Sequence, residues 1–181
     1  MLPKKQGLYS PEYEHDNCGA GFICSLQGKK TNDIIHKALD ILDCLEHRGA
    51  VSADGKTGDG AGILIEIPHE FLKNQCEFIL PEANEYAVGM VFLPQKDNQS
   101  SYCKGVLESE LKKQGLNVLG WRKVPVKHGV VGKIASQTEP KITQIFVSKG
   151  NKSISDHQFN NKLFCARKIS EHTILNSKLS Q

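Results

Sequence analysis

Residues 49–62 form a glycine-rich segment that leads directly into a short apolar run, residues 63–67. Its five glycines are Gly49, Gly55, Gly58, Gly60 and Gly62. So many glycines permit close backbone approach and suit a loop folded against a small molecule. A phosphate-binding loop would open onto a helix N-terminus, whereas residues 63–67 have the pattern of a strand. The segment therefore disfavours a nucleotide-binding fold, and a functional loop and a plain structural turn remain alternatives.

Strand and helix patterns alternate along the rest of the chain. Apolar runs bounded by turn residues predict strands at residues 22–26, 63–67, 86–93, 116–121 and 142–147. Helical spacing of apolar residues predicts helices at 31–45, 69–76 and 99–114, and a last helix capped by Ser153 or Ser155. No strand-to-helix turn carries the GxGxxG pattern of dinucleotide-binding folds. The order predicts a layered α/β or α+β domain.

Charge and hydropathy argue against several classes of protein. The net charge is only +3 and the lysines are scattered, so no basic stripe predicts nucleic-acid binding. No apolar run approaches the ~20 residues that cross a bilayer. Residues 1–7 lack the apolar centre of a secretory signal and the Arg- and Ser-rich character of a transit peptide. We expect a soluble protein that is not secreted, in the bacterial cytoplasm or, if plastid-encoded, in the stroma.

The chain has six cysteines, and one of them stands out. They are Cys18, Cys24, Cys44, Cys76, Cys103 and Cys165. Their wide spacing and the lack of a CxxC pair favour reduced thiols over disulfides or a zinc site. We expect five of them to be small buried hydrophobic residues. Cys18 differs because of its neighbours.

Cys18 follows an irregular polar leader, residues 1–17, and precedes Gly19 and a strand-like run. If the bond between Asn17 and Cys18 is cut, Cys18 gains a free α-amine with a pKa of about 8. That amine can accept the thiol proton through a water, and the thiolate can then attack a carboxamide. Gly19 is small, so the strand can start tightly at the site. A buried free cysteine at a strand start is the alternative.

Six ordered motifs carry a resemblance to a known family. They are residues 14–22 (EHDNCGAGF), 45–50 (LEHRGA), 57–65 (TGDGAGILI), 85–94 (EYAVGMVFLP), 119–125 (LGWRKVP) and 144–147 (QIFV). Together they resemble the class II glutamine amidotransferase domain of the glutamate synthase family, from about Gly7 to about residue 170.

The resemblance implies a fold and a set of site residues. The fold would be α+β, an N-terminal-nucleophile hydrolase with a four-layer αββα sandwich, here truncated at its C-terminal end. Residues 1–17 would be a propeptide, and residues 18–181 a partial amidotransferase domain. Cys18 matches the nucleophile, and Arg48 matches the arginine that binds the carboxylate of glutamine, a task that suits its planar guanidinium. The residues that would line or support the pocket are Gly49, Thr57, Gly58, Asp59 and Gly60.

Two departures from the family pattern bear on activity. Ala20 stands where valine is common, which is a mild change. The family's oxyanion pair, an Asn-Gly within a later His-Asn-Gly segment, has no counterpart in this sequence. Loss of one oxyanion donor costs about 10²–10³ in rate in other acyl-transfer enzymes. We therefore expect negligible glutaminase activity from residues 1–181 alone, as part of a longer enzyme.

The longer enzyme that the resemblance implies would use the released ammonia to convert 2-oxoglutarate to glutamate. FMN and a 3Fe–4S cluster would carry electrons from ferredoxin or from an NAD(P)H-oxidising small subunit. We expect none of these groups to bind residues 1–181. Two alternatives remain: another class II amidotransferase or amide hydrolase, and a non-catalytic binding module on the same scaffold.

Overall fold

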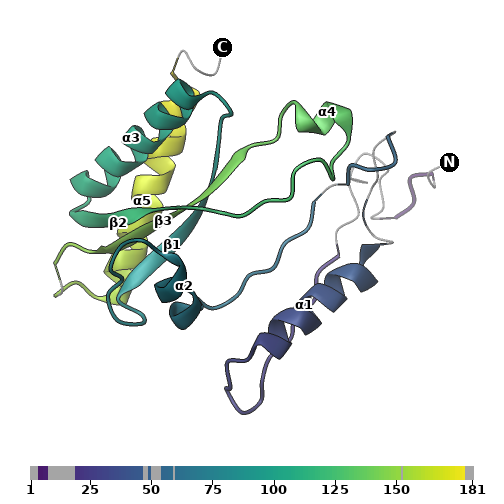
Figure 1. The fold of residues 1–181 in the computed structure, drawn as a ribbon, viewed down its shortest axis with the longest axis horizontal. Helices are drawn as coiled ribbons and strands as arrows, with labels where there is room; N and C mark the ends of the chain where they lie inside the picture. Colours follow the sequence, from purple (N-terminus) through teal and green to yellow (C-terminus); the bar gives the residue numbers. More distant parts are fainter. Residues whose placement is uncertain are drawn as a thin grey trace. The chain divides into compact units, whose positions relative to one another are not determined.

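The computed structural model describes residues 4–7, 19–46, 49, 54–58, 60–151 and 153–177. Contacts divide the chain into two compact units. Figure 1 colours the chain by its position in the sequence. The first unit comprises residues 1–66 and 129–135, and the second comprises residues 67–128 and 136–181.

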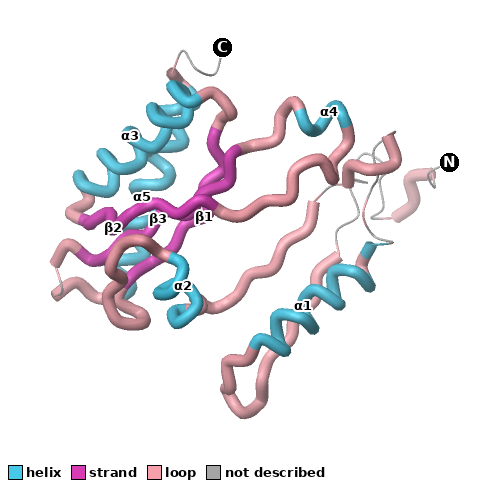
Figure 2. Tube along the Cα trace, in the orientation of Figure 1, coloured by secondary structure: helices cyan, strands magenta, loops and turns pink. Residues whose placement is uncertain are grey.

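The second unit is built on a three-stranded antiparallel sheet (Figure 2). Its strands are β1 (Tyr86–Leu93), β2 (Leu116–Lys123) and β3 (Lys141–Lys149), in the spatial order β1-β3-β2. Tyr86 pairs with Ser148 at one end of the β1–β3 ladder, and Leu93 pairs with Lys141 at the other. A bulge between Val118 and Gly120 interrupts the β2–β3 ladder. The three predicted strands in this part of the sequence are confirmed, and β2 and β3 are each slightly longer than expected.

Two helices cover one face of this sheet. They are α3 (Asp97–Lys113) and α5 (Asp156–Leu175), which confirm the predicted helices. The core between helices and sheet consists of Leu111, Leu116, Ile145, Val147, Phe159 and Ala166. Ser155 is the N-cap of α5: its hydroxyl accepts from the Gln158 N–H at 3.2 Å, and the Gln158 side chain accepts from the Ser155 N–H at 3.0 Å. This capping box satisfies two N-terminal donors of α5, so Ser155 rather than Ser153 begins the helix.

The opposite face of the sheet is covered only in part. Here the short helix α2 (His69–Gln75) contributes Leu72 to a cluster with Tyr86 and Phe146. Farther along β1 on the same face, Met90 and Phe92 are 50% and 63% exposed. One end of this face is therefore a hydrophobic core and the other end is open.

The first unit contains α1 (Asn32–Cys44), which confirms the helix expected over residues 31–45. Thr31 occupies the N-cap position, although its side chain makes no capping hydrogen bond. The segment that begins at Gly19 packs on this helix: a Cβ on Gly21 would come within 2.6 Å of Ile41 Cγ2. A further short helix, α4 (Lys133–Ser136), lies in the connection between β2 and β3.

Two of the predicted strands are wrong. Residues 22–26 and 63–67 form neither a strand nor a ladder in the described part of the chain. Phe22 and Leu26 are 91% and 99% exposed, so these two side chains lie outside any hydrophobic core. An apolar run favours extended backbone, but a strand also needs a neighbour for its N–H and C=O groups.

The prediction that five cysteines are buried is also wrong for three of them. All five are free, but Cys24, Cys44 and Cys165 are exposed, whereas Cys76 is half-buried and Cys103 is buried. Cys44 ends α1 and Cys165 lies on the side of α5 that faces away from its core. Residue type alone does not reveal which side of a helix faces the core.

Candidate functional site

The predicted site residues fall partly within the described chain. Asn17, Cys18, Arg48 and Asp59 lie outside the described residues. Gly49, Thr57, Gly58 and Gly60 lie within them, and all four belong to the first unit. Within the described chain, the candidate site is therefore represented by these four residues and by the residues that lie near Cys18 and Arg48 in the sequence.

Chain neighbours of Cys18 and Arg48 are in contact. A Cβ on Gly19, which follows Cys18 in the sequence, would lie 3.0 Å from Leu45 Cδ2. Leu45 is the C-cap of α1 and precedes Arg48 by three positions. Just beyond it, the Gly49 N–H donates to the Glu46 carbonyl at 3.0 Å. The start of the Gly19 segment and the C-terminal end of α1 thus lie together.

Asp54 organises a turn within the glycine-rich segment of residues 49–62. One carboxylate oxygen of Asp54 accepts from the N–H groups of Lys56 and Thr57, each at 2.9 Å. The other accepts from the Thr57 hydroxyl at 2.8 Å. Gly55, between Asp54 and Lys56 in the sequence, has a φ of +62°, a left-handed conformation that suits glycine. The backbone N–H groups of Lys56 and Thr57 hold the pKa of the Asp54 carboxyl below its ordinary value, because they stabilise its charged form.

A distant segment of the chain joins this turn. The backbone N–H of Gly132, in the connection between β2 and β3, donates to the Thr57 hydroxyl at 3.0 Å. Gly132 is buried, and a Cβ at this position would overlap the Asp54 carboxylate. The sequence did not predict this contact, because its partners lie 75 positions apart and no local pattern links them.

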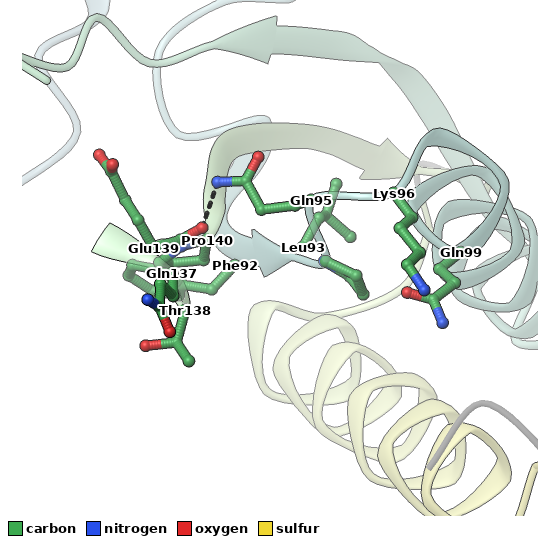
Figure 3. Close-up of a pocket in the computed structure, with 10 residues that line it drawn as sticks. Phe92, Leu93, Gln95, Lys96, Gln99, Gln137, Thr138, Glu139 and Pro140 are labelled. Carbon is green, nitrogen blue, oxygen red and sulfur yellow. Dashed lines mark hydrogen bonds between the residues drawn. The ribbon is translucent and has the colours of Figure 1, made fainter. Parts of the chain in front are cut away.

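A pocket in the second unit lies away from these residues in the sequence. It has a volume of about 410 Å³ and is lined by residues 92–96, Gln99 and residues 137–140. Among its lining residues, the Gln95 side-chain amide donates to the Glu139 carbonyl (Figure 3). Its lining includes no cysteine and none of the predicted site residues. The pocket therefore gives no support to the site that the sequence predicts.

The described residues contain neither a candidate metal site nor a candidate membrane span. Within them, no three His, Cys, Asp or Glu side chains gather closely enough to hold a metal ion. Likewise, none of the described helices combines the length and apolar character needed to cross a membrane.

Comparison with known proteins gives the family. The family described as class-II glutamine amidotransferases matches residues 18–181. The large chain of NADPH-dependent glutamate synthase is 41% identical over 173 residues in Bacillus subtilis (strain 168) and 41% identical over 176 residues in Azospirillum brasilense. Each of these matches covers 95% of this chain. Ferredoxin-dependent glutamate synthase 2 of Synechocystis is 40% identical over 159 residues, or 86% of this chain.

The matches cover only 11%, 12% and 10% of these three relatives, so the chain spans about a tenth of their length. The similarity nevertheless extends over nearly all of this chain. The expected resemblance is confirmed: this chain belongs to the class-II glutamine amidotransferases.

Proposed function

We propose that this chain supplies the glutaminase activity of a glutamate synthase, with Cys18 as the nucleophile. The observation that carries the proposal is where the family match begins. It starts at residue 18, so the region shared with the family opens on the cysteine itself. Residues 1–17 are then a propeptide, and residues 18–181 belong to the amidotransferase domain.

The chemistry follows from a cysteine with a free α-amine. The amine takes the thiol proton through a water, and the thiolate attacks the carboxamide carbon of glutamine. The C–N bond breaks, ammonia leaves with the proton, and the γ-glutamyl group remains on sulfur as a thioester. Water then cleaves the thioester, which releases glutamate and restores the thiol.

Arg48 binds the α-carboxylate of glutamine in this proposal, and Gly49 and residues 57–60 line or support the pocket. The contact between Gly19 and Leu45 supports the arrangement, since it joins sequence neighbours of the nucleophile and of the arginine. The guanidinium can form two parallel hydrogen bonds to a carboxylate, which fixes the substrate's orientation as well as its charge.

The complete domain, we propose, has the four-layer αββα architecture of N-terminal-nucleophile hydrolases. The partly open face of the β1-β3-β2 sheet supports a second sheet there, because exposed Met90 and Phe92 continue the face that Tyr86 and Phe146 bury. Two apolar segments that have no strand partner among the described residues, 22–26 and 63–67, further support additional strand pairing.

The named relatives suggest the reaction that consumes the ammonia. In the proposed whole enzyme, ammonia adds to 2-oxoglutarate, and reduction yields a second glutamate. FMN and a 3Fe–4S cluster, held outside residues 1–181, would relay electrons from the external donor to this reaction. The relatives' names include both NADPH and ferredoxin, so either donor fits the proposal.

Covalent labelling tests the proposed nucleophile. The protein is incubated with a diazoketone analogue of glutamine, and adducts are mapped by peptide mass spectrometry. We expect an adduct on Cys18 that excess glutamine prevents, and none on the Cys18→Ala variant. Cys24→Ala is the matched control, because Cys24 is an exposed thiol in the same unit.

The same experiment separates the alternatives. An adduct on Cys18 that glutamine does not prevent would favour an amide hydrolase with another substrate. Labelling confined to the exposed cysteines, with no effect of glutamine, would favour a non-catalytic binding module and contradict the proposal.

A further inference from the structure

We propose that Asp54, Thr57 and Gly132 form a latch that positions the glycine-rich loop for glutamine binding, an inference that rests on the proposed function. Throughout, "latch" means these three residues and the hydrogen bonds among them and Lys56. The latch acts through residues 58–60 and does not itself touch the reacting atoms, so its members are positioning residues.

The hydrogen bonds of the latch run in one direction. The Gly132 N–H donates to the Thr57 hydroxyl oxygen, and the Thr57 hydroxyl donates to Asp54. A hydroxyl can accept and donate at once, and here it uses both capacities. This series of hydrogen bonds ends on the Asp54 carboxylate, which also accepts hydrogen bonds from two backbone N–H groups. Hydrogen bonds to a charged acceptor are stronger than those between neutral groups.

The space at Gly132 excludes any side chain. A Cβ there would overlap the Asp54 carboxylate and lie 2.6 Å from Thr57 Oγ1. The φ of Gly132 lies outside the left-handed region, unlike the φ of +80° at neighbouring Gly129. A side chain at position 132 would therefore force the Asp54 and Thr57 side chains of the latch to shift, and this constraint comes from packing rather than from backbone conformation.

The loop needs such an anchor because its own sequence constrains it weakly. Gly58 and Gly60 are exposed, and no neighbouring atom lies within 4 Å of a Cβ built on Gly60 or Gly62. Ordering a free glycine-rich loop around a ligand costs conformational entropy, which weakens binding. Thr57 immediately precedes Gly58, so the latch fixes the position from which residues 58–62 of the loop continue. Its effect is therefore on the affinity for glutamine, not on the reactivity of the thiol.

Thr57→Val tests the latch because it removes the hydroxyl and keeps a branched side chain. The dissociation constant for glutamine is measured by titration calorimetry on the full chain, alongside its thermal unfolding. We expect Thr57→Val to weaken glutamine binding about tenfold, the equivalent of losing one to two good hydrogen bonds. Thr57→Ser retains the hydroxyl and is expected to restore wild-type affinity. Thr173→Val, at an exposed position of α5, is the matched control and leaves affinity unchanged.

A second variant covers the case in which Thr57→Val does not fold. Asp54→Asn keeps the shape of the exposed side chain and removes its charge, so the folded protein is expected to bind glutamine about threefold more weakly. Gly132→Ala should also weaken glutamine binding, because Gly132 donates the other hydrogen bond of the Thr57 hydroxyl.

The outcomes separate this inference from the proposed function. If the wild-type chain binds glutamine and the folded Thr57→Val and Asp54→Asn variants bind it equally well, the latch has no positioning role. A lower unfolding temperature with unchanged affinity would overturn the inference in the same way, because it would show a purely structural contact. Absence of glutamine binding by the wild-type chain would instead contradict the proposed function, and the latch's role with it.

Discussion

Gly21 lies against Ile41 of α1 so closely that a Cβ on the glycine would come within 2.6 Å of the isoleucine Cγ2. The contacts of Gly21 with Ile41 and of Gly19 with Leu45 hold the segment that begins at Gly19 against α1. Glycine at positions 19 and 21 is therefore a packing requirement of the first unit.

Substitution at this contact should destabilise the fold. We expect Gly21→Ala to lower the free energy of unfolding by about 1–3 kcal/mol, as other overpacking substitutions do. Urea denaturation followed by circular dichroism measures the change. Gly105→Ala is the control: nothing lies within 4 Å of its Cβ position in α3, so this variant should gain up to about 1 kcal/mol. Equal stability of Gly21→Ala and wild type would show that the close contact does not form.

The capping box of α5 predicts unequal roles for two serines. Ser155→Ala removes the acceptor for the Gln158 N–H and should cost about 1 kcal/mol of stability. Ser153 lies outside the helix, where its hydroxyl donates to the Asn151 side chain, so Ser153→Ala should cost less. Chemical denaturation of the two variants compares them directly. A larger loss for Ser153→Ala would place the start of the helix elsewhere.

The latch should weaken in acid. Backbone N–H groups lower the pKa of Asp54 in the folded chain, so its charged form is favoured by folding. The resulting stabilisation is complete above the unfolded pKa of about 4 and is lost as the pH falls through the lower folded value. Carboxyl-carbon NMR titration should find the pKa of Asp54 below that of an unfolded aspartate. The value should move toward normal in Thr57→Val, which removes one donor, and no difference between the two proteins would contradict the geometry.

Burial predicts the order in which the described cysteines react. Desolvation raises the pKa of the Cys76 and Cys103 thiols, which reduces the fraction of reactive thiolate. Alkylation with iodoacetamide at mildly alkaline pH should therefore modify the exposed thiols first, at Cys24, Cys44 and Cys165. Time-resolved peptide mass spectrometry gives the rates. Faster modification of Cys103 than of Cys165 would contradict the described packing of α3 and α5.

Local sequence patterns predicted much of the second unit. The strand expected over Tyr86–Leu93 has those bounds, and α3 and α5 follow the expected helical segments. These elements combine a strong pattern with a partner in the same part of the chain. Residues 22–26 and 63–67 have the pattern without a described partner, so their prediction as strands failed.

In the candidate site, too, local sequence patterns do not predict contacts between distant parts of the chain. Thr57 was singled out from the glycine-rich motif, but its contacts depend on Gly132, which no local pattern connects to it. Gly19 likewise packs on Leu45 at the C-terminal end of α1. No local sequence pattern predicts this contact. The chemistry of the residues predicts which of them belong to a site, whereas long-range packing determines which residues they contact.

The central claim is that Cys18 becomes the N-terminal residue and acts as the nucleophile. N-terminal sequencing of the protein purified from its native cells tests this most directly. The account predicts a mature chain that begins Cys-Gly-Ala-Gly-Phe, with residues 1–17 removed. A mature, active protein that still begins at Met1 would leave Cys18 without a free α-amine and would contradict the account.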